Sequence, residues 1–219
     1  MLNGKYLLRL FDDPDTVGDL REYYGVDPGG GANPGRGFDS LGPNIANRVT
    51  GADLVAVQCL GVVVPVRPAL DLLEGGLGDE LAHLLATVPD DVDLGTGDAA
   101  EAVSEGSAAD QAWSLLVNHD GVSRVVADKI LARKRPRLIP VWDQVVRCAL
   151  GRPQVGGVWG SLDRVIRTSE GAVIERLAGL REKAALDPEI APLRVLDVAV
   201  WMRHRPTHRR HDCPGGLGF

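Results

Sequence analysis

Apolar residues recur at helical spacing over most of the chain. The stretches with this pattern are bounded by capping residues, glycines or prolines, and they cover residues 50–60, 69–74, 79–88, 107–118, 141–150, 162–186 and 192–204. Apolar side chains three and four positions apart share one face of a helix, so each stretch predicts a helix with a buried side. The predicted fold class is mostly α.

The stretch that follows Thr50 has Asp53 three residues on, a variant of the capping box, and it is apolar on nearly every side, which predicts a buried helix.

Two short segments carry a weaker pattern. Residues 6–11 fit a short strand or a helix. Residues 62–64 are three valines, and β-branched residues favour strands, so a short strand stays an alternative there.

Glycine, proline and charge mark the predicted connections. Residues 25–37 are so rich in Gly, Pro and Asn that they predict a mobile loop. An alternative is that residues 33–42 form a lid over a ligand. Residues 90–106 predict an acidic surface loop. Residues 205–219 predict a disordered basic tail.

Composition sets the size of the core and the charge. The chain has 219 residues, of which 44% are hydrophobic, enough for one domain over residues 1–219 built as two helical lobes. Its 24 Lys and Arg against 30 Asp and Glu give a net charge of −6, which argues against a dedicated polyanion binder. The acids concentrate before Asp120 and the basic residues over 124–210, so any nucleic-acid contact belongs to the C-terminal half.

Cysteine spacing offers no metal motif. Cys59, Cys148 and Cys213 stand far apart and predict reduced thiols, mostly in the core. The tail offers further ligand types, namely His204, His208, His211 and Cys213, but its arginine-rich composition favours a basic tail over a metal site. We therefore predict no metal and no cofactor. No run approaches the roughly 18 apolar residues of a membrane span, which predicts a cytoplasmic protein without membrane contact.

The most specific pattern lies in the middle of the chain. A helix ends near Asn118, the chain turns at Gly121, and a new helix begins at once. Such a turn exposes backbone N–H groups at the positive end of the second helix, where a phosphate oxygen can bind without any side-chain charge. Arg124 stands beside the turn, and Arg135 and Arg137 follow the second helix as charges for neighbouring phosphates.

This pattern resembles a known superfamily. Gly121, Val122 and Ser123, with the small Ala127 and an aspartate 22 positions after the glycine, are similar to the hairpin and catalytic aspartate of the helix-hairpin-helix DNA glycosylases. The resemblance implies a helix-hairpin-helix motif over 108–134 that binds double-stranded DNA through Gly121, Val122 and Ser123. A second resemblance, over most of the chain from Gly37 to Asp143, is to an uncharacterised bacterial domain family of unknown function.

The glycosylase resemblance implies a catalytic role for Asp143. This residue would stand at a helix start beside a pocket for a base rotated out of the duplex, where Trp142 would stack on the base or fill the core. A carboxylate there stabilises the positive charge that develops on the sugar, or activates water, as the N-glycosidic bond breaks. Val125 stands where bifunctional members carry a lysine nucleophile, so the implied enzyme is a monofunctional hydrolase of a damaged or modified base.

Simpler interpretations stand beside this one. Ser123 replaces a second glycine of the family's hairpin, which weakens the close approach to phosphate. Asp143 also fits the role of a plain helix N-cap. The basic run over 133–137 also fits a solvated turn on the surface. The alternative function is a non-catalytic nucleic-acid-binding or interaction protein, and a third hypothesis is a regulatory or toxin-like protein acting through the acidic N-terminal half.

Overall fold

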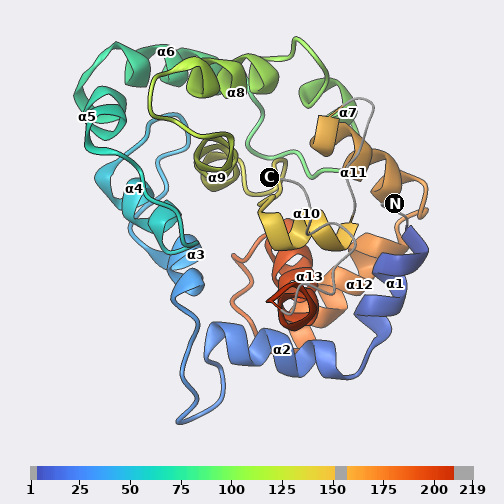
Figure 1. The fold of residues 1–219 in the computed structure, drawn as a ribbon. Helices are drawn as coiled ribbons and strands as arrows, with labels where there is room; N and C mark the ends of the chain where they lie inside the picture. The colour runs from blue at the N-terminus through green and yellow to red at the C-terminus, as the bar shows by residue number, and fades with distance from the viewer. Residues whose placement is uncertain (1–3, 151–156, 210–219) are drawn as a thin grey trace. The chain divides into compact units, whose positions relative to one another are not determined.

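A computed structural model describes residues 4–150 and 157–209, and its regular structure is helical throughout these ranges (Figure 1). The mostly α prediction is confirmed. Contacts between Cα atoms divide the chain into two compact units, one of residues 34–141 and one of residues up to 33 and from 142 onward. Each unit is described on its own below.

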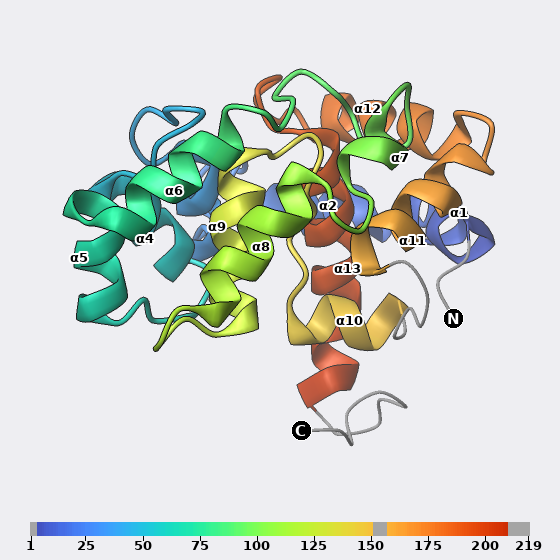
Figure 2. The same cartoon turned by 90° about the horizontal axis from the view of Figure 1, so that it is seen from above.

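The central unit, residues 34–141, is built on helices that pack both against sequence neighbours and against helices further along the chain. They are η1 (Pro34–Arg36), α3 (Gly37–Ser40), α4 (Gly51–Gln58), α5 (Val66–Glu74), α6 (Gly76–Leu85), α7 (Ala99–Ala102), α8 (Ala108–Asn118) and α9 (Arg124–Lys134). Helix α9 is the centre of this unit, because it packs against both α4 and α8 and its residues 129–134 are all buried. In Figure 2, α8 lies alongside α6.

The predicted start of α4 is confirmed in atomic detail. The Thr50 hydroxyl accepts a hydrogen bond from the Asp53 N–H at 3.3 Å, and the Asp53 carboxylate accepts one from the Thr50 N–H at 2.9 Å, which makes a complete capping box. The helix is less buried than its sequence predicts, since Val55 is 51% exposed. The valines at 62–64 form no strand within the described residues; they lie in an extended connection before α5.

The terminal unit is organised around its last helix. Its helices are α1 (Gly4–Asp12), α2 (Asp15–Tyr24), α10 (Gln144–Leu150), α11 (Gly157–Arg167), α12 (Ala172–Lys183) and α13 (Pro192–Arg209). Helix α13 packs against α2, α10 and α12, and residues 193–200 are buried on every side. Arg194 and Asp197 form an ion pair inside this core, and Arg194 also donates to the Tyr23 hydroxyl at 3.3 Å.

Residues 6–11 are helical, one of the two predicted alternatives. The loop predicted over 25–37 is irregular as far as residue 33, where Asn33 N–H donates to the Tyr23 carbonyl at 3.0 Å, but η1 and the start of α3 follow. Two further predictions differ in the structure. The predicted helix over 162–186 is two helices, because Gly171 takes a left-handed φ of +88° that ends helical geometry. The predicted tail is helical as far as Arg209, and residues 210–219 lie outside the described part.

Candidate nucleic-acid interface

The turn between α8 and α9, residues 119–123, presents the start of α9 to solvent. Gly121 has a φ of +85°, in the left-handed region that glycine adopts without strain. The Ser123 hydroxyl accepts from the Val126 N–H at 3.3 Å and so caps α9. Among the described residues, the N–H groups of Arg124 and Val125 have no acceptor, and both residues are exposed. We call this feature the α8–α9 turn.

Helix α5 holds the α8–α9 turn in place. A Cβ on Gly121 would lie 3.2 Å from the Cγ atom of Pro68, so the glycine permits close packing against α5. His119 Nε2 lies 2.8 Å from Asp71 Oδ2, a second contact between the turn and α5. The side chain of Val122 is buried beneath the turn, and its N–H donates to the His119 carbonyl at 3.1 Å, so neither is available to a phosphate. The turn is therefore a fixed surface.

Arg124 is positioned by an aromatic contact. The carbon at the centre of its guanidinium lies 5.9 Å from the centroid of the Trp113 ring, within the range of a cation–π interaction. The indole N–H of Trp113 donates to Asp128 at 2.7 Å, which fixes the ring on α8. Arg124 itself remains exposed at the start of α9.

Arg135 lies elsewhere than predicted. It is 1% exposed, and its five guanidinium N–H groups donate to five acceptors in the same unit. These acceptors are the carbonyls of Val88 at 3.0 Å, Ala46 at 2.6 Å, Lys134 at 2.8 Å and Leu85, and the side-chain oxygen of Asn47 at 2.7 Å. No donor is left for a phosphate, so the prediction that Arg135 binds nucleic acid is wrong.

The two preceding basic residues are also structural. Arg133 donates to Asp53 at 3.0 Å and to the Phe38 carbonyl at 2.6 Å, and Lys134 donates to Asp53 and to the Ile45 carbonyl at 3.0 Å. The end of α9 thus binds the segment over 38–47, which is irregular after α3 ends at Ser40, and we name residues 133–135 the basic clamp. Its function is to fix a segment that has little regular structure of its own.

Asp53 is the buried counter-charge of the basic clamp. Burial of its carboxyl favours the neutral acid, but hydrogen bonds from Lys134 and Thr50, with the charge of Lys134, outweigh burial, and the pKa of Asp53 is lowered. Burial lowers the pKa of Lys134, and Asp53 opposes that shift. The capping aspartate of α4 therefore also neutralises the clamp.

Arg137 is exposed, as predicted, but it has a partner. Its guanidinium binds the Asp93 carboxylate through two N–H groups, one at 2.9 Å. A phosphate would have to compete with that carboxylate.

Carboxylates also line a hollow of about 490 Å³ between the end of α6 and the start of α8. Its lining includes Asp98, Glu101 and Glu105 and no residue of the α8–α9 turn.

Asp143 stands directly before α10, the position that the glycosylase resemblance implies. Its Oδ1 atom accepts from the Val146 N–H at 2.9 Å, so the carboxylate is the N-cap of α10. The residue is half-buried. Trp142 is only 5% exposed, and its indole N–H has no hydrogen-bond partner in the described chain. A buried ring offers no open face for a base, which leaves Trp142 in its alternative role as core.

Cysteine chemistry differs from the prediction as well. Cys59 is a free thiol, whereas Cys148 is disulfide-bonded, so the expectation of reduced thiols is wrong for Cys148.

None of the helices within 4–150 and 157–209 combines the length and apolar character that crossing a bilayer requires.

Fold and site together define a mostly α-helical protein whose candidate site is an exposed turn between two helices. A family model matches residues 16–204, and the chain belongs to that family, described as "Family of unknown function (DUF6308)". No curated protein and no solved structure gives a significant match. The resemblance to an uncharacterised family is confirmed, and the resemblance to DNA glycosylases stays a prediction.

Proposed function

We propose that this protein binds the sugar–phosphate backbone of double-stranded DNA through the α8–α9 turn, independently of sequence. One observation carries the proposal: within the described part of the chain, the N–H groups of Arg124 and Val125 have no acceptor at the start of α9, where both residues are exposed. Backbone donors and the helix dipole together favour an anion at that point.

Local charge limits the strength of this binding. Asp120 is exposed within the turn, and the Asp71 carboxylate lies against His119, so two acidic groups flank the phosphate position. With a net charge of −6, the whole protein also repels DNA at long range. Binding is therefore weak and falls as salt rises, because each neutralised phosphate releases counterions.

Arg124→Ala tests the side-chain part of the proposal. Loss of one phosphate-contacting charge is expected to weaken duplex binding about equally across sequences and to reduce the salt slope by about 1. Fluorescence anisotropy with duplexes of unrelated sequence, titrated at several salt concentrations, measures both quantities.

Arg9→Ala is the matched control, because Arg9 is an exposed arginine on α1 and its loss changes net charge equally. Equal weakening by both substitutions would mean that overall charge, and not the turn, governs binding.

A second candidate function, base excision, has its own supporting observation. Asp143 places a carboxylate at the start of α10 with Oδ1 engaged by Val146, while Oδ2 has no partner among the described residues. An ionised carboxylate stabilises the positive charge that builds on the sugar as an N-glycosidic bond breaks. We propose Asp143 as that group in a monofunctional hydrolase.

Asp143→Asn separates catalysis from folding. Asparagine is as good an N-cap as aspartate, so the helix is retained while the charge is lost. Base release from a panel of duplexes with damaged or modified bases is expected to disappear in this variant. Asp187→Asn is the control, because Asp187 is exposed and its carboxylate likewise accepts from a backbone N–H, that of Glu189, at 2.9 Å.

The outcomes of this experiment are distinct. Release that persists in Asp143→Asn overturns the role of Asp143. No release from any duplex by the unmodified protein overturns base excision and leaves DNA binding as the function.

A further inference from the structure

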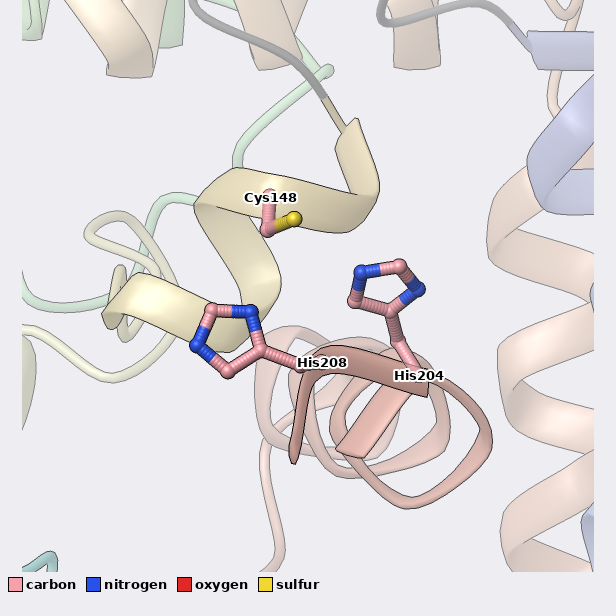
Figure 3. Close-up of side chains that lie close together, drawn as sticks. All are labelled: Cys148, His204 and His208. Atoms are coloured by element: carbon pink, nitrogen blue, oxygen red, sulfur yellow. The ribbon is translucent and has the colours of Figure 1, made fainter. Parts of the chain in front are cut away.

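Helices α10 and α13 bring three metal-ligating residue types together within the terminal unit. Cys148 lies on α10, and His204 and His208 lie one helical turn apart on α13 (Figure 3). Residues four positions apart share one face of a helix, and here that face is the one packed against α10. In Figure 3 both imidazole rings are directed toward the side of α10 that carries Cys148.

The three side chains are close enough to share one ion. One ligand atom from each, the Cys148 sulfur and a nitrogen from each histidine, lies within 4.8 Å of the others. Tetrahedral zinc, with bonds of about 2.0–2.3 Å, needs ligand atoms about 3.5 Å apart, a difference that side-chain rotation can close. The imidazole centroids are 6.2 Å apart.

The polar atoms at this place point to a ligand. His208 Nδ1 is buried and has no hydrogen-bond partner among the described residues, a costly arrangement for a polar atom. A cation at this place would give the buried His208 nitrogen a partner.

The state of Cys148 decides when a cation can bind. Cys148 is disulfide-bonded, and a sulfur in a disulfide is not the thiolate that ligates zinc. We propose that reduction of this disulfide creates a cation site of the zinc type, formed by the Cys148 thiolate with His204 and His208. The oxidised protein has two imidazoles there and holds the ion weakly or not at all.

The reaction balances with a dithiol as the reductant. The dithiol gives two electrons and two protons to the protein disulfide and becomes a disulfide itself, which leaves two protein thiols. Binding of Zn²⁺ then releases the Cys148 proton to solvent. Three protein ligands leave a fourth position for water, the arrangement of an exchangeable rather than a closed structural site.

The test compares the full-length protein with and without a dithiol reductant. After reduction and removal of the reductant, titration with Zn²⁺ against a chromophoric chelator is expected to show one tight site that the oxidised protein lacks. Co²⁺ in place of Zn²⁺ is expected to give the thiolate-to-cobalt charge-transfer absorption, which reports sulfur ligation directly.

Variants assign the ligands. Cys148→Ser, His204→Gln and His208→Gln are each expected to weaken the site at least about tenfold, since even the loss of supporting residues around a metal costs that much. His83→Gln and Cys59→Ser are controls that remove an exposed histidine and a free thiol of the other unit. Circular dichroism confirms that each variant is folded.

Three results would overturn the proposal. They are equal Zn²⁺ affinity in the oxidised and reduced protein, a reduced protein with no Zn²⁺ site, and unchanged affinity in the folded His204→Gln and His208→Gln variants. The test involves no DNA, so its result is independent of the function proposed for the α8–α9 turn.

Discussion

Replacing Asp53 with asparagine is expected to lower the free energy of unfolding by about 3–5 kcal/mol, the usual cost of removing one member of a buried ion pair. The physical reason is that Lys134 and Arg133 would keep their charges in a buried site without a counter-charge. Urea unfolding measures the loss, and an unchanged m-value shows that stability alone has changed.

Asp27→Asn is the control for this prediction. Asp27 pairs with Arg21 on the surface, where an ion pair contributes about 0–1 kcal/mol. Equal losses for the two substitutions would contradict the assignment of Asp53 as the buried counter-charge.

The same carboxylate gives the protein an acid-sensitive component of stability. The pKa of Asp53 is lowered on folding, so its contribution is complete above the unfolded-state value of about 3.9 and is lost as pH falls through the folded-state value. The stability difference between the unmodified protein and Asp53→Asn should shrink over that acidic range. A difference that stays constant to the lowest pH would contradict the lowered pKa.

Replacing Arg135 with methionine is expected to cost about 3–5 kcal/mol, because the uncharged side chain removes a donor from five acceptors, of which the Leu85 carbonyl keeps another donor, the Val88 N–H. The affected acceptors belong to the segment over 46–47 and to the end of α6. Both should therefore open more readily, and hydrogen exchange at residues 46–49 and 85–88 should speed up along with the loss of stability.

Arg137→Met is the matched control, two positions along the same run. The Arg137 side chain is half-exposed and, among the residues that the structure describes, bonds to Asp93 alone, so its loss is expected to change stability by no more than about 1 kcal/mol. A larger loss for Arg137→Met than for Arg135→Met would contradict the basic clamp.

Periodicity predicts helices well in this chain where a helix is long and buried on one side. The stretch over 107–118 corresponds to α8, and the stretch that begins at residue 192 corresponds to α13. Both are predicted well because side-chain spacing reports directly which face of a helix is buried. It fails at breaks within a continuous pattern. Leucine and isoleucine spacing continues through Gly171, whose positive φ separates α11 from α12 and leaves no trace in the hydrophobic pattern.

Charge patterning predicts only part of the candidate site. A run of basic residues usually lies on the surface, because charged side chains are rarely buried without partners. Here Arg133, Lys134 and Arg135 are buried with acceptors that mostly lie 47 to 95 positions away, a pairing that local sequence does not record. The apolar pairs at 130–131 and 138–139 on both sides of the run were the available signal.

The α8–α9 turn shows the opposite case. Its exposed N–H groups depend on local features alone, a glycine with positive φ and a serine N-cap, and these are visible in Gly121 and Ser123. The close contact with Pro68 and the ring of Trp113 beneath Arg124 come from other helices and could not be predicted.

The central claim, that the α8–α9 turn binds a DNA backbone, is tested most directly at the backbone amides. A titration of the ¹⁵N-labelled protein with a short duplex at low salt is expected to give its largest amide shifts at Ser123, Arg124 and Val125, and added salt should reverse them. Duplex binding that leaves these three amides unmoved, or no binding even at low salt, would contradict the claim.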